Sequence, residues 1–177
     1  VTLRNITSDT GIPTIAAVAD DVQMKDPRLL MIGMGTHTNP EIAMIRALTE
    51  VAQSRATQIH GAREDATIAQ FREMMGYDRV KRMNAYWFKG DEYEPASAVE
   101  SCATDDFKTD IEEIVSRLAA AGLDRVIVCD LTDPEIQIPV VRVIVPGLEC
   151  FTIDNERRGQ RCRDAEYRHF HRSKSSA

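Results

Sequence analysis

Residues 33–63, GMGTHTNPEIAMIRALTEVAQSRATQIHGAR, restrict the fold of this chain more than any other segment. Within them, Asn39, Pro40 and Glu41 form a helix-entry signal. An Asn can accept hydrogen bonds from the unpaired amides of a helix start, Pro fits the first turn, and an acid complements the positive end of the helix dipole. We therefore predict a long helix that begins here and follows a loop containing two glycines and a histidine.

At about 100° per residue, the predicted helix has two distinct faces. The face expected to pack is formed by Ile45, Leu48, Val51, Ala52, Ala56 and Ile59. The opposite stripe is polar and consists of Arg46, Glu50, Gln53 and Thr57. A solvated face is the ordinary interpretation of such a stripe. A binding role is the alternative, because Arg46 and Glu50 stand four apart in the less favourable order for a helical ion pair.

Three further residues carry groups that can take part in chemistry. His37, in the loop before the helix, can act as an acid or base or contact a substrate, or it can simply bond to the backbone. Arg142 stands in the apolar run VVRVIV, where a charge is costly unless it is paired or faces water. A phosphate or substrate contact and an edge-strand salt bridge are equal alternatives for it. His60 suits the dipole at the end of the predicted helix.

Apolar runs and helical periods alternate along the chain. Strands are predicted at residues 14–19, 29–33, 125–130 and 140–145, and further helices at 66–75 and 109–122. Residues 86–98 show no period and are expected to be irregular. This order predicts an α+β fold with helices layered on a mixed or antiparallel sheet. Residues 1–155 are expected to form the folded domain and residues 156–177 a basic, poorly patterned tail.

The composition argues against several classes of protein. The 177 residues are 43% hydrophobic, which is enough for one sizeable core. Because no apolar run reaches about eighteen residues and no signal peptide is evident, neither a membrane protein nor a secreted one is expected, and we place the chain in the cytoplasm. The four cysteines form no C-x-x-C pair, so a zinc site is not indicated. A chain that starts with Val1 fits an excerpt, a processed product or a subunit.

The segment GMGTHTNPEIAMIRALTEVAQSR resembles the second conserved block of the YcaO family. The upstream TSDTGIPTIAAV and the downstream VVRVIVPGLE are similar to two further family segments, in the expected order. The resemblance covers roughly residues 1–150 and corresponds to the second half of a YcaO domain. The family's first nucleotide-binding block, an Asn-Glu pair leading into a helix that ends in Glu-x-x-Glu-Arg, is not found in these residues.

The resemblance implies that ATP and Mg²⁺ are the cofactors and that polar residues of two related helices hold them. Carried over residue by residue, it implies that Glu50 is a magnesium or phosphate-side ligand and Gln53 its companion. Arg46 and Arg142 are candidates for neutralising phosphate charge. Asn39 is a weaker candidate that can equally be only a helix cap. No catalytic residue is implied directly, and His37 and Arg142 are the candidates.

The function implied is ATP-dependent activation of a peptide backbone amide through phosphorylation of its oxygen, which yields an azoline or a thioamide. The implied partners are a peptide or protein substrate, the N-terminal half of the domain, a TfuA-type protein and a second copy in a homodimer. This chain alone is expected to be inactive. The alternative is a non-catalytic interaction module derived from a YcaO domain. Nucleic acid is not an expected partner, because the basic tail lacks interleaved aromatic residues.

Overall fold

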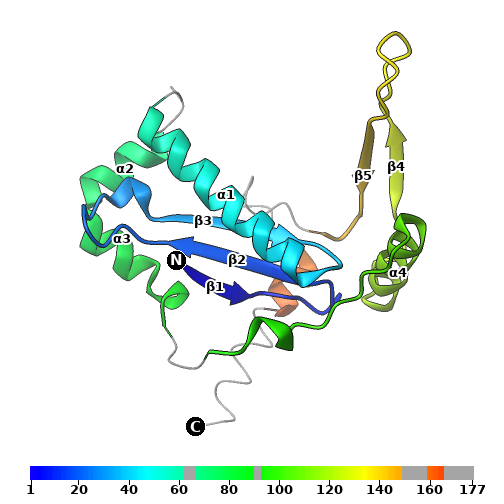
Figure 1. The fold of residues 1–177 in the computed structure, drawn as a ribbon, viewed down its shortest axis with the longest axis horizontal. Helices are drawn as coiled ribbons and strands as arrows, with labels where there is room; N and C mark the ends of the chain where they lie inside the picture. Colours follow the sequence, from blue (N-terminus) through cyan, green and yellow to red (C-terminus); the bar gives the residue numbers. More distant parts are fainter. Residues whose placement is uncertain (62–66, 90–92, 149–158, 166–177) are drawn as a thin grey trace. The chain divides into compact units, whose positions relative to one another are not determined.

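The computed structural model describes residues 1–61, 67–89, 93–148 and 159–165 (Figure 1). The chain divides into two compact units, Val1–Arg117 and Leu118–Ala177, and each contains an antiparallel sheet. Helices accompany both sheets, which confirms the predicted α+β class. Across the described ranges, no helix is long and apolar enough to cross a membrane.

The first unit is built on a three-stranded antiparallel sheet with the order β1-β2-β3. Its strands are β1 (Thr2–Asn5), β2 (Thr14–Ala19) and β3 (Met31–Thr36). The central strand β2 is the segment predicted at residues 14–19, and five of its six residues are buried. The flanking strands β1 and β3 are therefore the two edges of this sheet.

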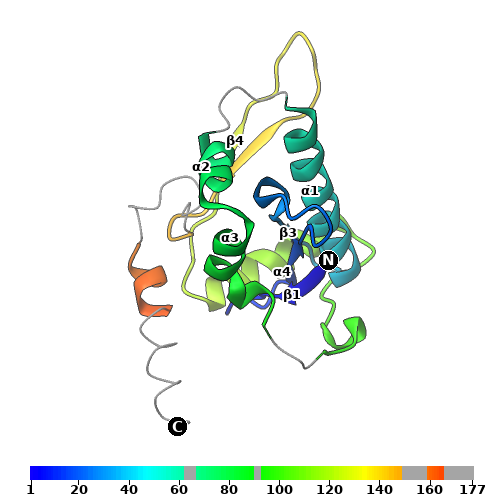
Figure 2. The same ribbon diagram turned by 90° about the vertical axis from the view of Figure 1, so that its left-hand side faces the viewer.

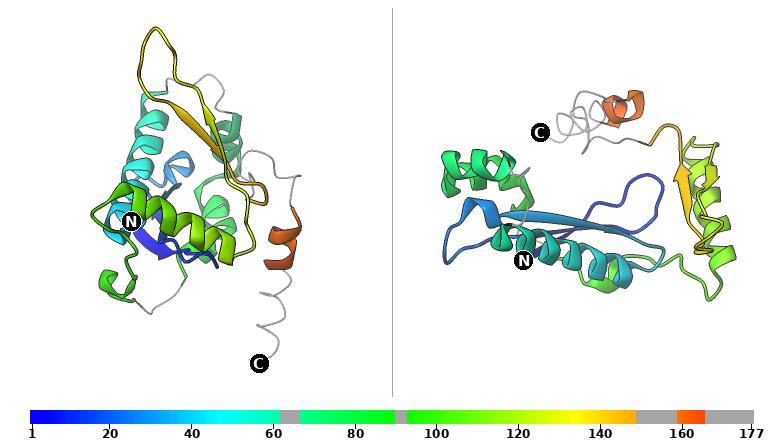
Figure 3. Two further views of the ribbon diagram at one scale, coloured as in Figure 1. Left: turned by 90° about the vertical axis from the view of Figure 1, so that its right-hand side faces the viewer. Right: turned by 90° about the horizontal axis from the view of Figure 1, so that it is seen from above.

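One face of the sheet is covered by the long helix α1 (Pro40–His60), which runs along β2 and β3 (Figures 1 and 3). Both elements contribute mainly small side chains to this interface, two alanines and one β-branched residue each. The buried cluster consists of Ile15, Ala17, Ala19, Ala43, Ala47 and Val51.

The opposite face of the sheet is covered around the 3-10 turn η2 (Ala85–Trp87), which follows α3 (Tyr77–Met83) (Figure 2). The buried side chains there are Ala16, Val18 and Trp87, with Ile6, Ile32 and Phe88 packed against them. The helix α2 (Thr67–Met75) packs against α3 and against the short turn η1 (Pro27–Leu29). A further short turn, η3 (Ala96–Ala98), lies in the segment predicted to be irregular.

Two glycines of β3 let the strand approach α1 very closely. A Cβ at Gly33 would lie 2.5 Å from the carbonyl oxygen of Ala47, and a Cβ at Gly35 would collide with the carbonyl oxygen of Ala43. Only a residue without a side chain fits such positions. The strand prediction at residues 29–33 was therefore wrong in its bounds, because both glycines lie inside β3 and not in a loop, and Pro27–Leu29 forms η1.

The predicted packing face of α1 was also wrong. Of its six members only Val51 is buried. Ile45, Leu48 and Ile59 are 58%, 40% and 70% exposed, and Ala52 and Ala56 are exposed as well. The physical reason is the close approach to β3, which admits the small Ala43 and Ala47 and excludes the larger side chains.

The helix α4 (Phe107–Ala120) starts earlier than the predicted residue 109. Its cap is Asp106, whose carboxylate accepts hydrogen bonds from both the backbone N–H and the hydroxyl of Thr109 at 2.8 Å. The carboxylate of an Asp is a strong acceptor for orphan helix amides, so the helix begins at the residue after it.

The second unit contains the hairpin of β4 (Ile127–Asp130) and β5 (Val141–Ile144), in which Ile127 pairs with Ile144 and Asp130 with Val141. Both strands lie within the residues 125–130 and 140–145 predicted to be extended. All four residues of β5 are exposed. Of the predicted tail, only residues 159–165 are described, and residues 160–165 are helical.

Candidate functional site

The start and end of α1 follow the sequence prediction. The side chain of Asn39 accepts a hydrogen bond from the backbone N–H of Glu41 at 2.8 Å, and Pro40 occupies the first helical turn. Gly61, in the left-handed conformation with a φ of 67°, ends the helix one residue after the exposed His60. Asn39 is therefore engaged as a helix cap, which was one of the two roles expected for it.

The polar stripe of α1 lies over the free edge of β3. One carboxylate oxygen of Glu50, Oε2, accepts a hydrogen bond from the backbone N–H of Met34 at 2.6 Å. The guanidinium of Arg46 donates to the carbonyl oxygen of Thr36 at 2.9 Å. The stripe thus satisfies backbone groups that an edge strand would otherwise leave to water. In the part of the chain that the structure describes, no ion pair joins Arg46 to Glu50.

Glu50 is held in a way that suits a ligand. The bond from Met34 fixes the direction of the carboxylate through Oε2, while Oε1 has no hydrogen-bond partner among the described residues. Metal-ligating carboxylates are commonly oriented by such an outer bond. Gln53 is exposed and follows Glu50 by three residues, so both side chains emerge on one side of the helix.

The loop between β3 and α1 places His37 beside the helix start. Its backbone N–H donates to the carbonyl oxygen of Pro13 at 3.1 Å, and its ring nitrogen Nδ1 accepts from the backbone N–H of Asn39 at 2.9 Å. Because Nδ1 is an acceptor, the neutral ring carries its proton on Nε2. The backbone-bonded role expected as one alternative for His37 is present, and it leaves Nε2 for another contact.

Sequence reasoning missed one long-range contact of the same loop. The hydroxyl of Thr38 donates to Asp110 at 3.1 Å, and Asp110 also accepts hydrogen bonds from the backbone N–H and the hydroxyl of Thr104. The bond from the Thr104 amide is the main reason why the pKa of Asp110 lies below its usual value. Thr38 and Asp110 are 72 residues apart, so no local pattern could have paired them.

Arg142 lies on β5 in the second unit, whereas the other site candidates lie on or beside α1 in the first unit. It stands opposite Cys129 in the hairpin register, and its side chain is exposed. Within the described ranges Arg142 takes part in no salt bridge, so the edge-strand ion pair, one of its two alternative roles, is not observed there. Exposure to water removes the burial cost that made this arginine conspicuous in the sequence.

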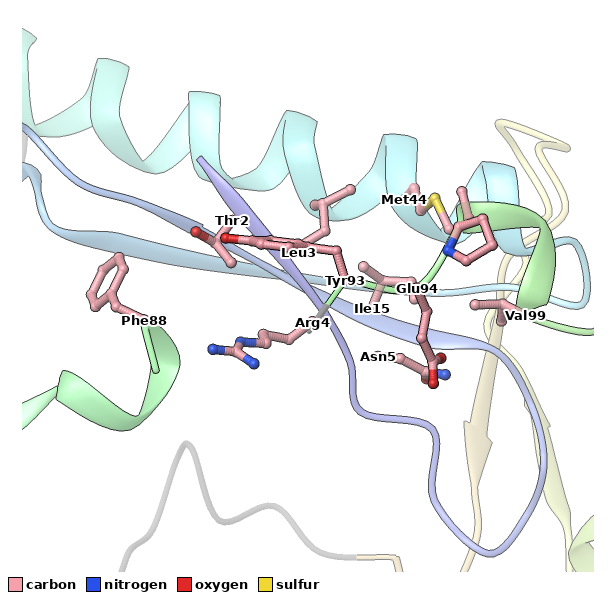
Figure 4. Close-up of a pocket in the computed structure, with 12 residues that line it drawn as sticks. Thr2, Leu3, Arg4, Asn5, Ile15, Met44, Phe88, Tyr93, Glu94 and Val99 are labelled. Carbon is pink, nitrogen blue, oxygen red and sulfur yellow. The ribbon is translucent and has the colours of Figure 1, made fainter. Parts of the chain in front are cut away.

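A pocket of about 370 Å³ lies at the other edge of the sheet, along β1 (Figure 4). Apolar side chains such as Leu3, Met44 and Phe88 surround part of it, and Arg4 donates to the carbonyl oxygen of Trp87 at 3.0 Å beside it. None of the residues predicted from the sequence to bind a ligand lines this pocket.

Comparisons with known proteins place these residues in context. The family model of the YcaO cyclodehydratases, described as ATP- and Mg²⁺-binding, matches residues 1–149. An uncharacterized protein of Methanothermobacter thermautotrophicus is 52% identical over 170 residues, which cover 93% of this chain and 43% of that protein. An uncharacterized protein in the tfuA 3' region of Rhizobium leguminosarum bv. trifolii is 33% identical over 166 residues, 83% of this chain and 36% of that protein.

Among solved structures, that of YcaO from Methanopyrus kandleri bound with AMPPCP and Mg²⁺ superposes with a TM-score of 0.75 and 31% identity. The match covers 89% of this chain and 42% of that chain. This chain therefore spans less than half the length of the relatives it matches. ATP and Mg²⁺, the cofactors expected from the sequence, are the ones that the family is described as binding.

Proposed function

The chain belongs to the YcaO family, and we propose that it supplies one side of an ATP- and Mg²⁺-binding site that activates backbone amides of a peptide. The observation that carries the proposal is the carboxylate of Glu50, anchored by the backbone of β3 on a helix within the matched residues. Carboxylate and amide oxygens are the ligands that Mg²⁺ prefers in proteins. Glu50 and Gln53 provide one of each on the same side of α1.

This chain would hold only part of the metal site. No group of three or more His, Cys, Asp or Glu side chains that could bind a metal occurs among the described residues. Mg²⁺ in nucleotide sites is usually held by one or two carboxylates together with phosphate oxygens and waters. Glu50 fits that role through Oε1, and the remaining protein ligands would come from the N-terminal half of the domain.

ATP supplies the phosphoryl group that turns the amide oxygen into a leaving group once a nucleophile has added to the amide carbon. The residues of this chain would position the reacting groups and neutralise their charge, which are the main protein contributions in phosphoryl transfer. Glu50 and Gln53 would hold Mg²⁺, and Arg46, whose guanidinium donates to the carbonyl oxygen of Thr36, lies one turn before Glu50. His37 can donate from Nε2 to an oxygen of the substrate or the nucleotide.

The partners follow from the same proposal. The substrate is a peptide or protein whose backbone amide becomes an azoline or a thioamide. A TfuA-type protein is a plausible companion because one relative is encoded in a tfuA 3' region. The rival function is an interaction module without chemistry, in which the exposed Glu50 would serve only to accept the hydrogen bond from Met34.

A chimera tests the proposal. This chain would replace the matching residues of the Methanothermobacter relative, and calorimetry would measure the binding of AMPPCP with Mg²⁺ to the chimera and to the chain alone. We expect binding in the chimera and little or none in the chain alone, because the site needs both halves. Absence of binding in a folded chimera would reject the proposal and favour the interaction module.

Release of phosphate from ATP, with and without peptide, would then separate binding from turnover. Arg142→Gln in the same chimera probes the second unit, since loss of a phosphate contact from that arginine would lower turnover. Wild-type turnover in this variant would remove Arg142 from the site and leave the proposal for α1 intact.

A further inference from the structure

Thr38 is a buried polar residue, 3% exposed, between the two loop candidates His37 and Asn39. Its hydroxyl donates to Oδ2 of Asp110 at 3.1 Å, and its carbonyl oxygen accepts from the backbone N–H of Cys102 at 3.0 Å. A threonine that is buried with both its side chain and its carbonyl bonded is fixed more firmly than an exposed loop residue.

Asp110 connects this threonine to a second segment. Its other oxygen, Oδ1, accepts hydrogen bonds from the backbone N–H of Thr104 at 2.6 Å and from the hydroxyl of Thr104 at 2.9 Å. An ionised carboxylate is an acceptor at both oxygens, so one side chain can receive all three bonds. An Asn could not, because its amide nitrogen is a donor.

These bonds fix the loop at the point where α1 begins. His37 is tied to Pro13 through its backbone and to Asn39 through its ring, and Thr38 is tied to Asp110. Moving Thr38 would move its neighbour His37 and the ring that Asn39 holds. At 1.5 Å per residue, by contrast, Asn39 lies about 16 Å along the helix axis from Glu50.

We propose that Asp110, acting through Thr38, is a positioning residue that sets the place of the His37 ring at the entrance of α1. This inference rests on the proposed function, in which His37 contacts the reacting groups. Loss of the Asp110–Thr38 bond lowers the rate of ATP turnover and leaves the binding of ATP and Mg²⁺ near Glu50 largely unchanged.

The kinetic test uses the chimera with the Methanothermobacter relative. Thr38→Val removes the hydroxyl with almost no change in volume, and Thr38→Ser restores it. We expect Thr38→Val to lower kcat for peptide-dependent ATP turnover about tenfold or more, since small misplacements of a reacting group are costly. KM for ATP should change less than about threefold, and Thr38→Ser should recover most of kcat. Equal kcat values for Thr38→Val and the wild type would overturn the inference.

Two matched controls make the result specific. Thr49→Val is the same chemical change within α1, where the hydroxyl donates to the carbonyl oxygens of Ile45 and Arg46. Asp110→Asn changes charge and not volume, and Asp106→Asn is its counterpart at the neighbouring helix cap. We expect Asp110→Asn to follow Thr38→Val in direction, and Thr49→Val and Asp106→Asn to retain wild-type kcat.

A spectroscopic measurement tests the positioning of His37 independently of ATP turnover. Nitrogen-15 chemical shifts of the His37 ring, assigned with a His37→Gln sample, report the tautomer in the 177-residue chain without ATP. We expect the Nε2-protonated tautomer in the wild type and a mixture of tautomers in Thr38→Val and Asp110→Asn. An unchanged tautomer in both variants would overturn the inference even if the chimera turns over ATP. If the chimera is inactive but the tautomer shifts, the proposed function fails and the positioning of His37 stands.

Discussion

The two segments that carry the candidate ligands are held in different ways. The helix α1, with Glu50 and Gln53, touches the backbone of β3 at Gly33 and Gly35. The strand β5, with Arg142, is exposed at all four residues and is paired with β4 in a two-stranded sheet. A hairpin of two strands is marginally stable by itself, whereas a helix packed on a sheet is a rigid support. The packing of α1 on β3 can therefore fix the direction of a ligating side chain, whereas the exposed β5 lacks such support.

The largest effect is expected where α1 and β3 touch. A Cβ at Gly35 would collide with the carbonyl oxygen of Ala43 and lie 2.6 Å from the backbone nitrogen of Ala47. Gly35→Ala should therefore lower the free energy of unfolding by about 3 kcal/mol, at the upper end for overpacking, because backbone atoms cannot move aside easily. Gly61→Ala is the control, because a Cβ there would meet open space and the only cost is the positive φ. This variant should lower the free energy of unfolding by about 1 kcal/mol. Thermal unfolding of both variants measures the difference.

The same change at two valines compares the packed helix with the hairpin directly. Val51 is 4% exposed in the cluster under α1, and Val143 on β5 is 55% exposed. Val51→Ala should cost about 2 kcal/mol of unfolding free energy through lost burial and a cavity, and Val143→Ala about 0.5 kcal/mol or less. Urea unfolding of the chain gives both values. Equal costs would mean that β5 is covered by other parts of the chain and would break the comparison.

Arg142 offers a smaller effect that sharpens the comparison. If it contacts phosphate, Arg142→Gln should lower kcat/KM for ATP in the chimera about tenfold, less than the roughly hundredfold or more lost with a preorganised contact in a closed site, because the side chain is exposed. Stability should change by about 0.5 kcal/mol or less, because the side chain is exposed. Arg125→Gln, next to the hairpin and exposed, is the matched control and should leave turnover unchanged. A loss of stability without a loss of turnover would assign Arg142 to the hairpin alone.

Acid titration gives the smallest effect and again separates the two regions. A bond from the Thr104 amide lowers the pKa of Asp110, and a bond from the Thr132 side chain lowers the pKa of Asp130 in the hairpin. A depressed pKa means that the folded state favours the ionised form. The stability it contributes is present above about pH 4, the unfolded pKa, and is lost as pH falls through the folded pKa.

The fluorescence of Trp87, the single tryptophan, reports unfolding of the first unit. Asp110→Asn should make the acid transition of Trp87 shallower below about pH 4, whereas Asp130→Asn should leave it unchanged. A shallower transition in both variants would show that the two units unfold together.

The sequence predicted the parts of the fold that depend on local signals. Asn39 and Pro40 marked the start of α1 through capping, His60 was expected near its end, and the run at residues 14–19 indicated the central strand. Prediction from the sequence was wrong where the structure depends on contacts between residues far apart in the chain. Apolar periodicity favours Ile45 and Leu48 for the buried face of α1. The face that is buried is instead the one that meets Gly33 and Gly35, because the backbones approach so closely there that only small side chains fit.

The candidate site shows the same division. Glu50 and Gln53 could be singled out because their block resembles a family segment, and Asn39 because it stands before a proline. The bond from Met34 to Glu50 and the bond from Thr38 to Asp110 join residues 16 and 72 positions apart. Such contacts arise from the tertiary fold, so helical or strand periodicity carries no signal for them.

Turnover in the Glu50→Gln chimera tests the central claim most directly. A Gln keeps the volume and its carbonyl oxygen can still accept from Met34, so the fold should remain nearly as stable. The loss of the negative charge should lower ATP turnover about a hundredfold or more if Glu50 organises Mg²⁺. Glu112→Gln, which removes an exposed carboxylate 3.6 Å from Lys108, should leave turnover unchanged. Wild-type turnover in Glu50→Gln, with an unchanged Tm, would contradict the account and leave Glu50 as a cap on the edge of β3.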